Sequence, residues 1–166
     1  MSSAFDMPQS RFPSVYLDAL DRRVLIYDGA MGTNIQRAGL IAADVGGQSL
    51  EGCNDNLVLT RPDVIQSIHE SFLAVGCDVV ETGTFQATRL RLAEWGQAER
   101  TLELNRAGAA LARRLCDEYS TDEHPRFVAG SMGPTGYLPS CSGPTLSNIT
   151  FAELVETFAE QAQGLI

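Results

Sequence analysis

An alternation of helix and strand is clearest in residues 59–85, which read LTRPDVIQSIHESFLAVGCDVVETGTF. Apolar residues recur at helical spacing over the first part of this stretch, at Val64, Ile65, Ile68, Phe72 and Leu73. The spacing predicts an amphipathic helix with Thr60 as its N-cap, Pro62 in its first turn and Gly76 as its stop. The apolar run that follows directly, residues 77–80, predicts a buried strand.

The same pattern extends in both directions along the chain. The apolar run 24–28 leads into a glycine-rich turn and predicts a buried strand, and the run 126–131 predicts a third strand that ends before Gly133-Pro134. Helices are expected over residues 13–23 and about 98–119, the second burying Leu104, Gly108, Leu111 and Leu115. Strands that alternate with helices in this way predict an α/β fold with a parallel sheet, either open or closed into a barrel.

A last helix is predicted to begin after Thr150, because Thr150 and Glu153 have the spacing of a capping box. Its apolar face, which we expect to belong to the core, consists of Phe151, Leu154, Val155, Phe158, Ala162 and Leu165. A Pro/Ser/Gly-containing loop is expected at 138–149. Residues 34–59 lack sustained periodicity, and a loop of that length within a domain is usually functional.

Composition restricts the class of protein. The 166 residues include 12 Lys+Arg against 21 Asp+Glu, a net charge of −9, and 44% are hydrophobic. This acidic balance argues against nucleic-acid and anionic-membrane binding, which need basic surfaces, and favours a small-molecule partner. The first residues are polar and no run reaches the length of a membrane span, so we expect a flexible leader at 1–12 and a cytoplasmic protein. The irregularly spaced Cys53, Cys77, Cys116 and Cys141 favour reduced thiols over disulfides or metal ligands.

Candidate site residues follow from position. Asp28 ends the first predicted strand and Glu81 the second, while Gly130 and Ser131 end the third. Because the carboxyl ends of parallel strands form the ligand face, these groups should converge at one site. Carboxylates can pair with an ammonium group, whereas glycine-turn amides and hydroxyls, here Thr82, Thr84, Ser131 and Thr135, can receive a carboxylate. The sequence therefore predicts a site for a small zwitterion.

Simpler roles remain open for the same residues. Acidic residues at strand ends also cap helices or bind neighbouring amides, and glycines follow strands for backbone reasons alone. The turn GAMGTN lacks both phosphate-binding glycine patterns, GxxxxGK[ST] and GxGxxG. His69 and His124 have no partner at ligand spacing and are expected to be structural or solvated. Residues 54–56, Asn-Asp-Asn, could reach a ligand or form a turn before a helix.

Four segments in order carry a family resemblance: LIYDGAMGTNIQ (25–36), EGCNDNLVLTRPDVIQSIHESFLAVGCDVVETGTFQAT (51–88), RFVAGSMGPTG (126–136) and SNITFAELVETF (147–158). The chain resembles, from Leu25 to Ile166, the N-terminal homocysteine-binding (homocysteine S-methyltransferase) domain of cobalamin-dependent methionine synthases. The resemblance implies a (β/α)8 TIM-type barrel that binds homocysteine at its top face. It also implies methyl transfer to the homocysteine thiol, giving methionine.

Cofactors and site roles come from the same resemblance. The family domain holds Zn²⁺ through three cysteines, and the zinc makes the homocysteine thiolate available at neutral pH. Methylcobalamin and methyltetrahydrofolate are carried by other modules of the full protein. Asp28 and Gly29 match the DG motif that contacts the amino-acid end of homocysteine, and Glu81, Thr82 and Thr84 match the second-strand motif lining the same pocket.

This sequence departs from the family pattern in three places. Gly83 stands where many relatives have Asn or Asp, and Cys53 where others have Asn. The family's zinc cysteines, which include an adjacent Cys-Cys pair, have no counterpart here, so we expect no catalytic residue and no metal ligand in this chain.

The chain is shorter than a complete barrel, and this determines the expected domain boundaries and activity. A TIM barrel takes about 250 residues, so residues 24–166 correspond to the first three βα units of an incomplete barrel, preceded by a leader and short helix at 1–23. We therefore expect an apparently truncated methyltransferase, inactive by itself. Two alternatives remain: a non-catalytic α/β binding or assembly module completed by a partner chain, and a self-contained small α/β domain of unrelated function.

Overall fold

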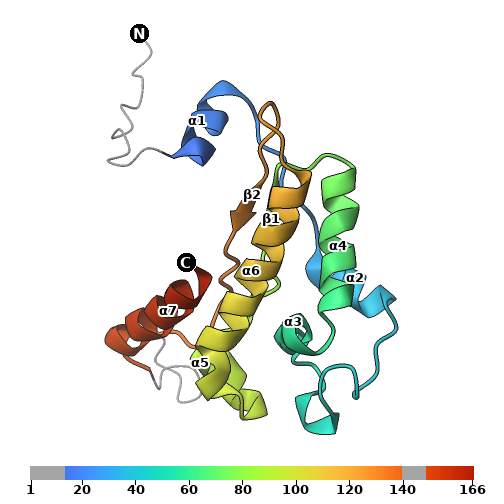
Figure 1. Cartoon of the computed structure of the whole chain (residues 1–166). Coiled ribbons are helices and arrows are strands. Elements are labelled where there is room, and N and C mark those ends of the chain that lie inside the picture. The colour runs from blue at the N-terminus through green and yellow to red at the C-terminus, as the bar shows by residue number, and fades with distance from the viewer. Residues whose placement is uncertain (1–13, 140–148) are drawn as a thin grey trace.

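The computed structural model describes residues 14–139 and 149–166 and has an α/β architecture (Figure 1). In chain order its elements are α1 (Val15–Arg22), α2 (Met31–Arg37), η1 (Gln48–Leu50), η2 (Asn54–Asn56), α3 (Leu57–Thr60), α4 (Pro62–Ala74), β1 (Val79–Glu81), α5 (Arg89–Leu92), η3 (Ala93–Trp95), η4 (Ala98–Arg100), α6 (Thr101–Tyr119), β2 (Phe127–Ala129) and α7 (Phe151–Leu165), where η denotes a 3-10 helix. No helix in the described ranges is both long enough and apolar enough to cross a membrane.

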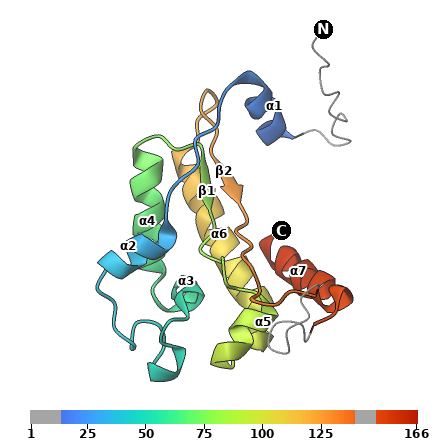
Figure 2. The same cartoon turned by 180° about the vertical axis from the view of Figure 1, so that it is seen from behind.

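The strands confirm the predicted parallel arrangement. β1 and β2 pair in parallel with Val80 opposite Val128. The expected first strand runs beside β1 on its other edge, where it is tied by a single parallel bridge between Tyr27 and Val79 (Figure 2). Three segments separated by helices therefore lie in sequence order across the sheet.

The prediction of a buried strand at 24–28 is wrong in part. Leu25 is buried, but 78% of Val24 and 57% of Ile26 are exposed. The segment pairs with β1 through a single bridge, and Tyr27 is also 42% exposed, so most of its side chains are not buried. It is held instead by backbone hydrogen bonds, including Asp28 N–H to the Val79 carbonyl at 2.9 Å.

Helices α4 and α6 lie on the same side of the strands and contribute nearly half of the buried core residues (Figures 1 and 2). The predicted stripe of α4 is confirmed: Val64, Ile65, Ile68 and Leu73 are buried, and Phe72 packs against the core while partly exposed. The predicted buried residues of α6, Leu104, Gly108, Leu111 and Leu115, are also confirmed. Burial of this kind contributes roughly 25 cal/mol per Å² of apolar surface and holds the strands against the helices.

The start of α4 differs from expectation. Thr60 is not its N-cap, because Thr60 ends the preceding helical turn α3 and its hydroxyl donates back to the Asn56 carbonyl at 3.2 Å. Arg61 occupies the cap position without a side-chain cap bond, and Pro62 is the first helical residue as predicted. Gly76 follows the helix with φ of 101°, the left-handed conformation that glycine adopts without strain.

Helix α7 has the predicted start but presents a different face. Thr150 and Glu153 form the capping box. The expectation that the Phe/Leu stripe is core is wrong in part: 73% of Phe151 and 49% of Val155 are exposed, and the other four stripe residues are only partly buried. The buried residues are Thr157, Gln161 and Gly164. A small and polar face therefore packs on α6, because Gly164 lets the two helices approach closely: a Cβ there would lie 2.6 Å from Asn105 Cβ.

The expected leader, residues 1–12, and most of the expected loop at 138–149, including Cys141, lie outside the described residues. The expected short helix at 13–23 is present as α1. The boundary between a leader with a short helix and a barrel portion beginning at residue 24 stays a prediction.

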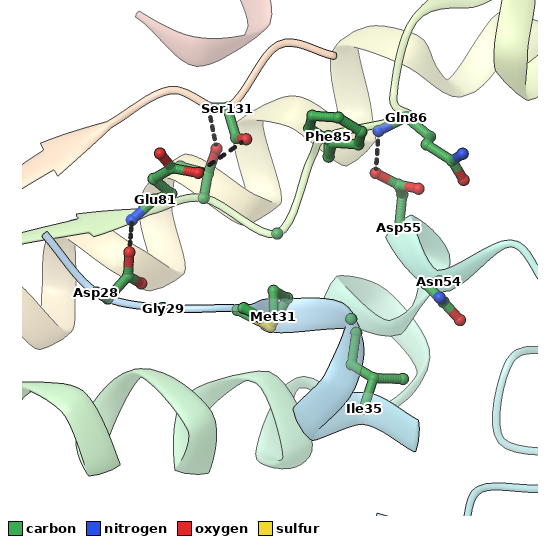
Figure 3. A pocket seen from close by; sticks show the side chains of 14 residues that line it. Asp28, Gly29, Met31, Ile35, Asn54, Asp55, Glu81, Phe85, Gln86 and Ser131 are labelled. Carbon is green, nitrogen blue, oxygen red and sulfur yellow. Dashed lines mark hydrogen bonds between the residues drawn. The ribbon is translucent and has the colours of Figure 1, made fainter. Parts of the chain in front are cut away.

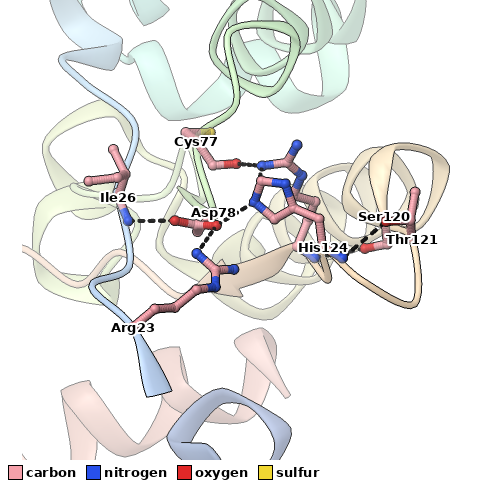
Figure 4. A network of polar contacts seen from close by, with 8 residues as sticks. Arg23, Ile26, Cys77, Asp78, Ser120, Thr121 and His124 are labelled. Atoms are coloured by element: carbon pink, nitrogen blue, oxygen red, sulfur yellow. Dashed lines mark hydrogen bonds and ion pairs between the residues drawn. The ribbon is translucent and has the colours of Figure 1, made fainter. Parts of the chain in front are cut away.

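A buried carboxylate fastens the amino-terminal ends of the strands together. Asp78 precedes β1 and is 2% exposed. Its Oδ1 accepts hydrogen bonds from Arg23 at 2.6 Å and from His124 at 2.7 Å, and its Oδ2 accepts the backbone N–H of Ile26 at 2.8 Å (Figure 4). One side chain thus joins the segment after α1, the start of β1 and the loop before β2. This end lies opposite to the predicted site.

Candidate functional site

A cavity of about 670 Å³ opens at the carboxyl ends of the strands (Figure 3). Its wall comes from the turn after the first strand segment, from α2, from η2, from the turn after β1 and from the residue two positions beyond β2. The lining residues are Asp28, Gly29, Ala30, Met31, Gly32, Ile35, Asn54, Asp55, Glu81, Thr82, Gly83, Phe85, Gln86 and Ser131. The structure therefore brings four of the five predicted site residues, Asp28, Gly29, Glu81 and Thr82, to one cavity.

Asp28 is held by the neighbouring strand. Its Oδ1 accepts the backbone N–H of Glu81 at 3.1 Å, and its own N–H donates to the Val79 carbonyl. The side chain is only 3% exposed. Burial raises the pKa of Asp28 to about 6, with the nearby Glu81 carboxylate adding to the rise and the Glu81 N–H opposing it. A ligand cation at this point would offset the burial cost of the carboxylate.

Glu81 is the exposed carboxylate of the pair. It ends β1, and its Oε2 accepts a hydrogen bond from the Ser131 hydroxyl at 3.4 Å. Ser131 follows β2, so this contact links the ends of two neighbouring strands. With Asp28 tied to the Glu81 backbone, the two acidic side chains lie at adjacent strand ends, the arrangement predicted from the sequence.

The predicted hydroxyl groups divide into two layers. Thr82 lines the cavity, and its Oγ1 accepts the Ser131 N–H at 2.9 Å. Thr84 lies behind the wall: it is fully buried, and its Oγ1 is 2.6 Å from Thr82 Oγ1 and donates to the Ser131 carbonyl at 3.0 Å. Thr135 does not line the cavity and instead bonds with the Tyr137 backbone. Thr84 therefore supports the residues that form the wall.

Residues 54–56 form the turn that the sequence left open as one of two roles, and contact with a ligand stays a prediction. They form the turn η2 before α3, while Asn54 and Asp55 line the cavity. Asp55 is 5% exposed, and its Oδ1 accepts the Gln86 N–H at 2.9 Å. Burial raises the pKa of Asp55 to about 6 against the lowering effect of that hydrogen bond. Asn56 instead donates to the Val45 carbonyl at 2.6 Å.

The apolar part of the wall was not predicted. Met31 and Ile35 come from α2 and Phe85 from the turn after β1, where 55% of its surface is exposed. Gly133 fixes that turn, since its N–H donates to the Phe85 carbonyl at 2.9 Å and a Cβ on Gly133 would overlap the same carbonyl oxygen. Met31 and Phe85 lie within four residues of the predicted strand ends Asp28 and Glu81, and that proximity is the signal that could have identified them. Ile35 lies further along and has no such signal.

The described cysteines do not fit a zinc site in the cavity. Cys53, Cys77 and Cys116 are buried free thiols, none lines the cavity, and Cys116 donates to the Phe127 carbonyl at 3.3 Å. Burial raises the pKa of each to about 11, which opposes the thiolate form that a metal needs. Within residues 14–139 and 149–166, no group of three His, Cys, Asp or Glu side chains could hold a metal ion.

Comparison with known proteins identifies the family. The family model for homocysteine S-methyltransferase matches residues 25–166. The chain belongs to the homocysteine S-methyltransferase family. It is 41% identical over 150 residues to a methionine synthase of Mycobacterium tuberculosis and 39% identical over 158 residues to that of Mycobacterium leprae. These alignments cover 90% and 95% of this chain but 12% of each relative, so the chain corresponds to a small part of those proteins.

Solved homocysteine S-methyltransferase structures support the fold. The oxidized form of the Escherichia coli homocysteine methyltransferase MmuM matches with a TM-score of 0.67 and 23% identity, covering 88% of this chain and 50% of that one. Its metallated form matches with a TM-score of 0.68 and 22% identity, covering 89% and 52%. The α/β fold is therefore shared with about half of the MmuM chain.

Proposed function

We propose that the cavity binds homocysteine by its amino-acid end, as one part of a methionine synthase-type homocysteine S-methyltransferase domain. The observation that carries this proposal is the pair of carboxylates at adjacent strand ends, Asp28 and Glu81, in a cavity whose described lining includes no lysine, arginine or histidine. An excess of acidic side chains favours a ligand that presents an ammonium group. Membership of the homocysteine S-methyltransferase family suggests that this ligand is homocysteine.

The rest of the cavity suits the other groups of that ligand. Backbone N–H groups in the Gly29–Met31 turn are donors available to the ligand carboxylate. Met31, Ile35 and Phe85 give an apolar wall for the methylene groups and the sulfur. A Cβ on Gly29 would lie 3.1 Å from the Phe72 ring, so glycine at this position lets the turn pack closely against α4.

The wider enzyme is part of the same proposal. Three parallel strand segments in sequence order, with α4 and α6 on one side, support the first three βα units of an incomplete (β/α)8 barrel. Methyl transfer to the homocysteine thiol, Zn²⁺, methylcobalamin, methyltetrahydrofolate and the modules that carry them are assigned to the full-length protein. No described cysteine fits the zinc, so this chain supplies substrate-binding groups and is expected to be inactive alone. The free thiols of the described cysteines support action in the cytoplasm.

A second candidate, a non-catalytic binding or assembly module, is favoured by the exposed apolar side chains. Val24 and Ile26 on the first strand segment, and Phe151 and Val155 on α7, leave apolar surface uncovered in the described structure. Under this alternative, a partner chain would cover both faces, and homocysteine would not bind to the strand ends.

Calorimetry separates the two candidates. Homocysteine and 4-mercaptobutanoate, which lacks only the amino group, are titrated into the 166-residue chain, its Glu81→Gln variant and a Glu99→Gln control. Glu99 is 88% exposed at its side chain and pairs with Arg89, away from the cavity lining. The proposal predicts binding of homocysteine but not of 4-mercaptobutanoate, weakening by at least about tenfold in Glu81→Gln, and no change in the control. Equal binding of the two thiols would refute it.

A further inference from the structure

His69 is a buried polar residue in the apolar face of α4. It lies one helical turn from Ile65 and from Leu73, both buried, and is itself fully buried. Neither ring nitrogen has a hydrogen-bond partner among the described residues. A buried donor or acceptor without a partner costs about 1–3 kcal/mol, so an imidazole at this position calls for an explanation.

The ring lies against the site. His69 Nδ1 is 3.9 Å from Asp28 Oδ2, the carboxylate oxygen that does not accept the Glu81 N–H. Both side chains are shielded from solvent, at 0% and 3% exposed. A shortening of about 1 Å would give an ordinary N–H···O distance. Helix α4 therefore places a potential donor directly behind the acidic group of the cavity.

Protonation states favour donation in this direction. Burial lowers the pKa of His69 to about 4, so the ring is neutral near pH 7 and carries one N–H. The other titratable groups that interact with Asp28 are Glu81 at the end of β1, Cys77 before β1 and Cys116 on α6. Both thiols stay neutral near pH 7, since burial raises the pKa of each to about 11.

We propose that His69 is a positioning residue for Asp28: when Asp28 is ionised, its Oδ2 accepts a hydrogen bond from His69 Nδ1–H, so that both carboxylate oxygens are held. The Glu81 N–H holds Oδ1 from the strand side and His69 holds Oδ2 from the helix side. His69 does not line the cavity and would act on the ligand only through Asp28. This inference rests on the proposed role of Asp28 in binding the ligand's ammonium group.

Nuclear magnetic resonance of the 166-residue chain tests the hydrogen bond without any ligand. The chain has two histidines, so ¹⁵N-histidine labelling gives His69 and an internal control, His124, which lies at the opposite end of the strands and is 42% exposed at its side chain. At pH 8 we expect the His69 proton on Nδ1. A proton on Nε2 would overturn the proposal, and this measurement needs no variant.

Variants supply the second readout, the titration midpoint of the Asp28 carboxyl carbon. His69→Leu removes the donor, whereas His69→Asn places an amide N–H near the position of Nδ1. The midpoint should rise by about one pH unit in His69→Leu and return toward wild type in His69→Asn. Equal midpoints in wild type and His69→Leu would contradict the hydrogen bond, with amide spectra confirming that each variant is folded.

Homocysteine binding then separates this inference from the proposed function. His69→Leu should weaken binding and His69→Asn restore it, without any change at a ligand-contacting side chain. If the chain failed to bind homocysteine while His69 carried its proton on Nδ1 and shifted the Asp28 midpoint, the proposed function would fail and the positioning of Asp28 would stand.

Discussion

The Asp28 carboxylate accepts the backbone N–H of Glu81 at 3.1 Å, across 53 residues of sequence. This one hydrogen bond ties the end of the first strand segment to the end of β1. It also sets the two acidic side chains of the cavity beside one another, with Asp28 buried and Glu81 exposed. The geometry of the site therefore depends on how the strands pair.

Asp28→Asn should separate the structural and ligand-binding roles of Asp28. The amide oxygen can still accept the Glu81 N–H, so the chain should stay folded, whereas the negative charge is lost. We expect homocysteine affinity to fall by at least about tenfold, measured by calorimetry. Asp63→Asn, on an exposed side chain of α4 paired with Arg61, is the matched control and should bind normally. Unchanged homocysteine affinity in Asp28→Asn would show that the Asp28 carboxylate does not bind the ligand's ammonium group.

Asp55→Asn should change how stability depends on pH. The pKa of Asp55 is raised from 3.8 to about 6 by burial, so the folded chain binds a proton more tightly than the unfolded chain. The stabilisation of the folded chain by protonated Asp55 is fully present below pH 4 and is lost as pH rises through 6. Asn cannot ionise and keeps an acceptor for the Gln86 N–H. The free energy of unfolding of the variant should therefore rise relative to wild type, by up to about 3 kcal/mol, as pH increases from 4 to 7.5.

Urea unfolding at several pH values measures that difference. His69 acts in the opposite direction, because its pKa is lowered by burial and its contribution is lost as pH falls from about 6.5 toward 4. Both chains contain His69, so its effect cancels in the comparison. Parallel stability curves for wild type and Asp55→Asn would mean that Asp55 is not buried as the structure shows.

Gly133→Ala should destabilise the chain through the Phe85 turn. A Cβ at this position would overlap the Phe85 carbonyl oxygen, so the backbone must shift, at a cost of about 1–3 kcal/mol. Gly32→Ala is the comparison, since a Cβ there meets no atom within 4 Å and Gly32 lies in helix α2. It should be neutral or stabilising by up to about 1 kcal/mol. Equal unfolding free energies for the two variants would contradict the close approach.

Asp78→Asn should weaken the attachment of the amino-terminal segment. Burial alone would raise the pKa of Asp78, but the Ile26 N–H, His124 and Arg23 hold it below its ordinary value, so the carboxylate stabilises the fold at neutral pH. Its removal should cost about 3 kcal/mol, measured by thermal or urea unfolding at pH 7. Glu99→Gln, which breaks an exposed ion pair with Arg89, should change stability by less than about 1 kcal/mol. A similarly small loss in Asp78→Asn would argue against the network in Figure 4.

The sequence predicted the parts of the molecule that depend on periodicity and strand order. The stripes of α4 and α6 follow from helical spacing, and Asp28 and Glu81 converge because parallel strands end at the same edge. No helices were predicted within residues 34–59, because the short helices there depend on single contacts and not on a periodic apolar pattern. One such contact is the hydrogen bond from the Asn56 amide to the Val45 carbonyl.

The buried face of α7 shows why hydrophobicity alone misled. Gln161 is fully buried because its Nε2 donates to the Thr84 carbonyl at 2.9 Å, a backbone group 77 residues away. Gly164 is buried because α6 approaches closely there. Neither the Gln161 hydrogen bond nor the close approach at Gly164 can be recognised from the local sequence. The apolar stripe, and not these residues, was therefore predicted to face the core. His69 was predicted to be structural or solvated, and its position beside Asp28 depends on packing between α4 and the first strand segment.

The most direct test of the account is an amide chemical-shift map of homocysteine binding to the ¹⁵N-labelled 166-residue chain. We expect saturable shifts to concentrate at the carboxyl ends of the strands, in Asp28–Met31, Glu81–Gly83 and Ser131, and 4-mercaptobutanoate not to reproduce them. Shifts confined to the Asp78 end of the strands, or identical shifts with both thiols, would contradict a cavity that recognises the amino-acid end of homocysteine.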